Sequence, residues 1–205
     1  MSNFSFYTIL SSAEGYYKES GSKFLAFAYP VDSEVEIKEK IELLKKKYFD
    51  ATHHCFAWIL GSDKDRFRAV DDGEPSHSAG DPILGQIRSK NLTNVLVVVV
   101  RYYGGIKLGV GGLIHAYKLA AEEALNNAQI VEKEVTEKFQ IRYPYDETPE
   151  VMKLIKDFDV KILSQEYAED CLLKTQVKLK EKDELMNKII LLNALGRKIS
   201  LSVIA

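Results

Sequence analysis

An apolar run without polar interruption, "VLVVVV" at Val95–Val100, is the feature of this sequence that most limits its fold. A strand with one wet face alternates apolar and polar side chains. Because this run does not alternate, we expect a central strand that is buried on both faces. It is also far too short to cross a membrane, and we expect no membrane association.

The run leads into "RYYGGIKLGVGG", and its last nine residues hold five of the chain's 12 glycines. "LIHAYKLAAEEALNNA" follows and predicts a helix whose small residues pack closely on the sheet. Free N–H groups at the start of such a helix attract anions, which gives one interpretation of the glycines. Tight packing between strand and helix is the other, because neither the Walker A spacing nor GxGxxG is present. The residues expected to bind an anion are Gly104, Gly105, Lys107, Gly109, Gly111 and Gly112.

Upstream of this run, the sequence predicts two strands and two helices. Residues 21–30 and 53–60 read as strands, and residues 82–90 read as a short helix whose first turn accommodates Pro82. Residues 33–48 form a helix pattern with capping-box spacing between Ser33 and Glu36. Its apolar face is Ile37, Ile41, Leu44 and Tyr48.

The pattern changes near residue 128, where a second set of elements begins. The expected order is strand, helix, strand, strand, helix, strand, at Val135–Tyr143, Pro149–Phe158, Val160–Tyr167, Cys171–Lys180, Lys182–Asn193 and Ile199–Ile204. This βαββαβ order is that of the ferredoxin-like split arrangement. We therefore expect two domains, residues 1–130 and residues 131–205.

The stretch "DDGEPSHSAG", residues 71–80, is too polar to be core. Its acids are expected to cap backbone, to lie solvated, to hold a cation or to act as bases. Its serines, Ser76 and Ser78, are expected to cap the following helix or to contact a phosphate. No EF-hand pattern is present, and we expect no metal site.

The histidine pair before Cys55 does not form a catalytic dyad with it. Adjacent strand residues point to opposite faces, so His54 and Cys55 diverge, whereas His53 shares a face with Cys55. We expect the histidines to hydrogen-bond or stack at a cleft. The expected cleft consists of His53, His54, Asp71, Asp72, Glu74, Ser76, His77, Ser78, Arg101, Tyr102 and Tyr103.

The charge and cysteine content narrow the class of protein. The formal net charge is −2, so any RNA must be bound by a local patch and not by a basic chain as a whole. The two cysteines, Cys55 and Cys171, make neither a disulfide framework nor a zinc pattern. We expect reduced, buried thiols in a cytoplasmic protein, and the first residues do not read as a signal peptide.

Three blocks, "HHCFAW", "DDGEPSHSAGDPILGQI" and "VVVVRYYGGIKLGVGGLIHAY", together resemble the signature of the YigZ/IMPACT family. Residues from about 134 to 205 resemble the C-terminal domain of its bacterial members. The resemblance implies an α+β chain with an N-terminal α/β domain like the second domain of ribosomal protein S5. It also implies a ferredoxin-like C-terminal domain, and the pair is similar to the last domains of elongation factor G.

The same resemblance bears on function. The eukaryotic branch regulates translation by binding a partner protein, and no reaction is attached to the bacterial branch. One departure stands out, because the family usually reads Gly-Thr-Ala-Gly, often followed by a basic residue. Here the chain has His77, Ser78, Ala79, Gly80 and Asp81.

Two functional hypotheses follow. The first is a non-catalytic protein of translation that contacts RNA, the ribosome or a translation-related protein through the cleft. Aromatics of the second domain's sheet would extend its surface, although half of Phe139, Tyr143 and Tyr167 must face the core. The second is an enzyme acting on a nucleotide or phosphorylated small molecule, with Mg²⁺ on the acids and phosphate on the glycine turn. We favour the first, without a cofactor, because no nucleophile–base pair is convincing; the oligomeric state is left open.

Overall fold

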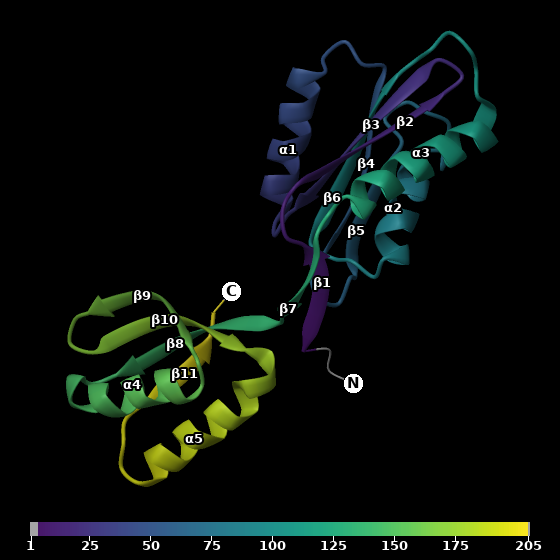
Figure 1. Cartoon of the computed structure of the whole chain (residues 1–205). Helices are drawn as coiled ribbons and strands as arrows, with labels where there is room; N and C mark the ends of the chain where they lie inside the picture. The colour runs from purple at the N-terminus through teal and green to yellow at the C-terminus, as the bar shows by residue number, and fades with distance from the viewer. Residues whose placement is uncertain (1–3, 205) are drawn as a thin grey trace. The chain divides into compact units, whose positions relative to one another are not determined.

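The computed structural model describes residues 4–204, and the chain divides into two compact units (Figure 1). The first unit is Phe6–Lys133. The second contains the chain from Glu134 together with Phe4 and Ser5. Each unit has its own hydrophobic core.

The first unit is built on a five-stranded sheet. Its order is β2 (Ala13–Glu19), β3 (Ser22–Pro30), β6 (Val95–Tyr102), β4 (His53–Leu60) and β5 (Arg66–Val70). The apolar run lies in the central strand, and Val95–Val100 are all buried, as the missing alternation predicted. β3 and β4 both pair with it antiparallel.

Helices cover both faces of this sheet (Figure 1). α1 (Glu34–Lys47) packs on one face, and α2 (Gly80–Ser89) and α3 (Gly109–Asn126) pack on the other. Half of the capping box is present, because the Ser33 hydroxyl accepts from the Glu36 N–H at 3.3 Å. The Glu36 carboxylate accepts from the N–H of Asp32, one residue before the N-cap, at 2.8 Å.

Two helices begin earlier than the sequence suggested. α2 begins two residues before Pro82. α3 begins at Gly109, so Gly109, Gly111 and Gly112 lie in its first turn and not ahead of it. The first turn tolerates glycine here because packing of the later residues, such as Ala116 and Tyr117, holds the helix on the sheet.

Four strands were not expected from the sequence. β2 and β5 are the edge strands of the large sheet. β1 (Ser5–Ile9) and β7 (Ile130–Glu134) pair in a separate two-stranded sheet.

The second unit has the expected βαββαβ order. Its elements are β8 (Thr136–Tyr143), α4 (Thr148–Asp157), β9 (Lys161–Tyr167), β10 (Cys171–Lys178), α5 (Lys182–Ala194) and β11 (Ser200–Val203). The sheet order β11-β8-β10-β9 is ferredoxin-like, with both helices on one face (Figure 1). Phe139 and Tyr143 face this core and cannot stack a base, whereas Tyr167 is exposed on an edge strand.

Both cysteines are buried free thiols, as expected. Between residues 4 and 204, no helix is long and apolar enough to cross a membrane.

Candidate functional site

The site begins with a row of side chains at one end of the large sheet. The strand register places Arg101 of β6 between Phe24 of β3 and His53 of β4. Alternation along a strand puts these three side chains on the face covered by α2 and α3. The Arg101 guanidinium lies 5.4 Å from the centre of the Phe24 ring.

Arg101 and Glu74 form a buried ion pair in this row. Their N–O distance is 2.5 Å, and their side chains are only 5% and 4% exposed. The same Glu74 oxygen accepts from the Tyr117 hydroxyl at 2.8 Å and lies 3.8 Å from His53 Nε2. A buried charge costs several kcal/mol unless it is paired and hydrogen-bonded, so these contacts hold the acidic loop against α3.

The Cys55 thiol and the Tyr117 hydroxyl lie next to this ion pair and favour their protonated forms. The Cys55 thiol donates to the Asp71 carbonyl at 2.9 Å and lies 3.3 Å from the Tyr117 hydroxyl. Burial raises the pKa of Cys55 well above its ordinary value, and burial together with the neighbouring Cys55 does the same to the pKa of Tyr117. Neither side chain is a ready nucleophile at neutral pH.

Asp71 is the cap of α2, which corrects the expected role of the serines. Its carboxylate accepts from the backbone N–H groups of His77, Ala79 and Gly80 at 2.9, 3.0 and 2.8 Å. Ser78 instead donates to the Pro75 carbonyl at 2.6 Å. Burial alone would raise the pKa of Asp71, but these three donors outweigh it and hold the pKa below its ordinary value.

His54 and Tyr102 lie on the opposite face of the sheet from Arg101, so the structure removes both from the expected cleft. Each directly neighbours a residue of the row, and alternation turns its side chain toward the face that carries α1. Burial lowers the pKa of His54, which disfavours its charged form. The Asp72 carboxylate accepts from the His54 backbone N–H at 2.6 Å, so this acid ties the loop to β4.

His77 and Ser76 are exposed. His77 has a φ of 65°, in the left-handed region that favours glycine, and its Nδ1 lies 2.6 Å from the Asp81 carboxylate. The glycine that the resemblance implies at this position would adopt this φ without strain. Histidine is one of the few side chains that tolerate such a φ.

The glycines of the turn serve different purposes. Gly104 packs against Gly21, where a Cβ would lie 1.9 Å from a backbone carbon. Gly105 and Gly109 have φ values of 87° and 67°. At Gly111 a Cβ would have no described atom within 4 Å. The packing interpretation thus accounts for Gly104, while Gly109 and Gly111 leave the start of α3 open.

The acidic loop and the glycine turn do meet, at a pocket of about 380 Å³. We call it the Arg101 pocket. Of the residues expected at the site, it is lined by Glu74, Arg101, Tyr103, Lys107 and Gly109. Sequence reasoning missed its apolar lining, which is Pro75, Leu108, Val110 and Leu113.

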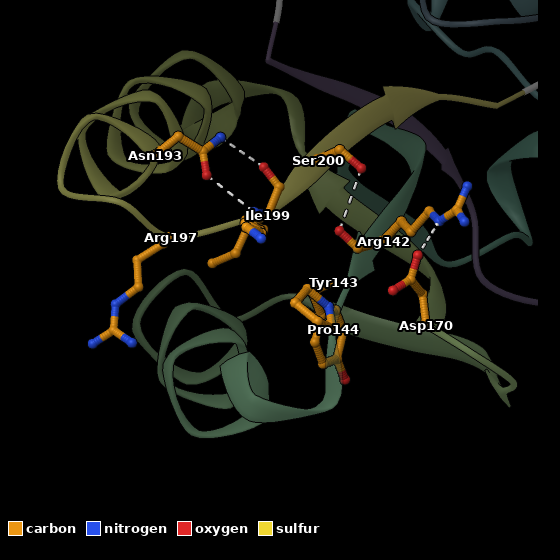
Figure 2. Close-up of a pocket in the computed structure, with 9 residues that line it drawn as sticks. Arg142, Tyr143, Pro144, Asp170, Asn193, Arg197, Ile199 and Ser200 are labelled. Carbon is orange, nitrogen blue, oxygen red and sulfur yellow. Dashed lines mark hydrogen bonds and ion pairs between the residues drawn. The ribbon is translucent and has the colours of Figure 1, made fainter.

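A pocket of about 590 Å³ in the second unit is a weaker candidate (Figure 2). Arg142 pairs with Asp170 at 2.7 Å (Figure 2). The Arg197 guanidinium pairs with Glu147 at 3.3 Å. Asn193 is occupied with the backbone of Ile199. The side chains of Arg142, Asp170, Asn193 and Arg197 are therefore already engaged with other groups of the second unit.

Among the described residues, no cluster of three His, Cys, Asp or Glu side chains could hold a metal ion. The Asp71 and Asp72 carboxylates receive backbone donors, and Glu74 receives Arg101 and Tyr117. The acids thus serve as internal acceptors.

The fold and the site define a two-unit α/β protein with a small apolar pocket above a buried ion pair. A model of the Impact N-terminal domain matches residues 20–125. YvyE, an IMPACT family member of Bacillus subtilis, is 33% identical over 177 residues, which cover 86% of this chain and 82% of that relative. The family member YigZ of Escherichia coli is 33% identical over 155 residues, covering 75% and 76%. The chain belongs to the IMPACT family.

The solved structures agree with this fold. One described as "Crystal structure of an hypothetical protein" has a TM-score of 0.78 and 28% identity. The match covers 100% of this chain and 99% of that one.

Proposed function

We propose that this chain is a non-catalytic RNA-binding protein linked to translation, and that the Arg101 pocket holds a phosphate group of the RNA. The link to translation rests on family membership, since the resemblance implies a translational role for the eukaryotic members. The phosphate rests on the geometry of the pocket.

The observation that carries the proposal is the incomplete pairing of Arg101. Its guanidinium donates to Glu74 and Ser22, but Nε is buried and has no hydrogen-bond partner within residues 4–204. A buried N–H without an acceptor costs about 1–3 kcal/mol. An oxyanion in the pocket would recover this cost once the Arg101 side chain turns Nε toward it.

Two further features favour an anion at the same place. The N-cap position of α3, Leu108, gives no side-chain hydrogen bond, so the N–H groups of the first turn are open to a ligand. Lys107 also lines the pocket, is exposed and makes no ion pair within the described chain.

The chemistry of the neighbouring groups supports binding over catalysis. An activated nucleophile needs a lowered pKa or an adjacent base. The pKa of Cys55 and that of Tyr117 are both raised, and the carboxylate nearest to them, Glu74, already accepts from Arg101 and Tyr117. Nothing in this group is poised to remove a proton from a substrate.

The test is binding of a fluorescent single-stranded RNA of about ten nucleotides, followed by anisotropy across a salt series. Lys107→Gln should weaken binding severalfold and reduce the magnitude of the log–log salt slope by about 0.7, the value of one phosphate contact on a single strand. The matched control is Lys118→Gln, because Lys118 is also an exposed lysine and lies within α3, outside the lining of the Arg101 pocket.

Failure of the wild-type protein to bind RNA at low salt would overturn the proposal. An equal effect of the two lysine variants would overturn the phosphate site in the Arg101 pocket. The alternative is an enzyme that acts on a nucleotide. A thermal-shift screen of mononucleotides, with and without Mg²⁺, identifies any nucleotide that stabilises the protein. Conversion of any stabilising nucleotide would show a catalyst in place of a binding protein.

A further inference from the structure

A second hollow lies on the other face of the same sheet end. It measures about 520 Å³ and is lined by Tyr16, Lys23, Leu25, Asp50, Tyr102 and Tyr103. We call it the Tyr16 pocket. Tyr103 also lines the Arg101 pocket, so the two pockets share this residue at the end of β6.

The alternation of β6 explains why the pockets lie on opposite faces. Arg101 faces α3, Tyr102 faces the α1 side, and Tyr103 follows at the strand end. On the α1 side, Tyr16 pairs with Leu25 and Lys23 pairs with Tyr102. Tyr102 and Leu25 remain only half-buried.

Tyrosine rings are the main surface of this pocket. Tyr16 is 53% exposed and Tyr103 is 47% exposed. The Arg101 guanidinium lies 5.6 Å from the centre of the Tyr103 ring, and the Tyr102 hydroxyl donates to Asp50 at 2.8 Å. These contacts restrain the rings of Tyr103 and Tyr102 before any ligand arrives, which lowers the entropic cost of stacking on those two rings.

Two lysines lie beside the rings, and the one carboxylate that lines this pocket, Asp50, accepts from the Tyr102 hydroxyl. Lys18 and Lys23 are direct cross-strand partners on β2 and β3. Both are exposed, and neither makes an ion pair anywhere in the described residues. Like charges directly opposite one another destabilise a sheet, and a bound anion would remove that penalty.

We propose that the Tyr16 pocket binds one nucleotide of a single-stranded RNA, with the base stacked on tyrosine and the phosphate at Lys18 and Lys23. This inference rests on the proposed function and deepens it, since the strand would cross the sheet end at Tyr103 and place a neighbouring phosphate in the Arg101 pocket. Flat exposed rings beside unpaired cations are the usual means of holding single strands. An apolar protein segment would leave both ammonium groups uncompensated.

The experiment compares an oligoadenylate of about ten nucleotides with an abasic ribose-phosphate strand of equal length. Tyr16→Thr keeps a strand-forming residue and removes the ring, and it should weaken oligoadenylate binding about tenfold. It should leave binding of the abasic strand unchanged, because that strand has no base to stack. Lys23→Gln should weaken binding of both strands.

The control is Phe67→Thr, which removes an exposed ring from the opposite edge strand of the same sheet. It should not alter either affinity. Equal loss of both strands in Tyr16→Thr would indicate a structural effect and overturn the stacking role.

The two proposals fail in different ways. Wild-type affinity in Tyr16→Thr and Lys23→Gln, with weakened binding in Lys107→Gln, overturns the Tyr16 pocket and leaves the proposed function standing. If Tyr16→Thr weakens RNA binding and Lys107→Gln does not, the phosphate site in the Arg101 pocket alone is overturned. Absence of any RNA binding by the wild-type protein overturns both.

Discussion

At the scale of single residues, the two departures from the family pattern form one interacting pair. The resemblance implies glycine where this chain has His77, and a basic residue where it has Asp81. The His77 ring contacts the Asp81 carboxylate at 2.6 Å, and both side chains are exposed, away from the Arg101 pocket. The substitutions thus change the loop surface and leave the ion pair of the pocket intact.

The buried ion pair gives a prediction for stability. Glu74→Gln keeps the shape of the side chain but leaves the Arg101 charge buried without its carboxylate, which should cost about 3–5 kcal/mol. Urea unfolding followed by the fluorescence of Trp58, the chain's one tryptophan and part of the first unit's core, measures this loss.

The matched control for this prediction is Glu34→Gln. Glu34 pairs with Arg66 at 2.7 Å, but their side chains are 53% and 60% exposed. Solvent screens such a pair, and its loss should cost less than about 1 kcal/mol. Equal losses of unfolding free energy in Glu74→Gln and Glu34→Gln would show that burial does not set how much the Arg101 ion pair contributes to stability.

The acidic loop shows the limit of sequence reasoning at this scale. The sequence indicated that the Ser78 end of the loop was a helix cap and left several roles open for the acids, backbone capping among them. The structure gives the cap to Asp71, which reaches across the loop to three backbone donors. A side chain that caps a helix nine residues later depends on the loop's path, which local spacing does not encode.

At the scale of elements, one substitution at the start of α3 can separate the stability of the helix from its binding of RNA. Gly111→Ala adds a methyl group to an ordinary helical position with no described atom within 4 Å. Replacing glycine by alanine in a helix stabilises it by up to about 1 kcal/mol. The same methyl should occupy space above the first-turn N–H groups and weaken RNA binding.

The control is Gly85→Ala in α2, which also has open space around its added Cβ. Both variants should raise the unfolding midpoint, and only Gly111→Ala should lower RNA affinity in the anisotropy assay. Unchanged affinity in Gly111→Ala would remove the helix start from the site.

Elements with a strong period were predictable, and edge elements were not. The unbroken run of β6 and the helical spacing of α1 specify their environments directly. β5, "RFRAV", has no fully buried residue, and β2, "AEGYYKE", has none either. These strands exist because their backbones pair with β4 and β3, and that pairing leaves little trace in the local pattern.

At the scale of the whole molecule, the chain contains two units whose cores share no residue. The core of the second unit includes Leu173 of β10, and the core around Trp58 includes Leu96 of β6. Family membership explains the combination of domains, whereas the ligand must be inferred from the pockets of the first unit alone.

Separate cores predict separate stabilities. Leu173→Ala removes a fully buried side chain and should cost the second unit about 2–5 kcal/mol. Hydrogen exchange followed by mass spectrometry should show lost protection in β8 and β10, while the Trp58 unfolding midpoint stays at its wild-type value. The mirror variant, Leu96→Ala, should lower the Trp58 midpoint and leave β8 and β10 protected. A parallel fall in both readouts for either variant would mean that the two units unfold as one, because the loss of one core would then propagate to the other.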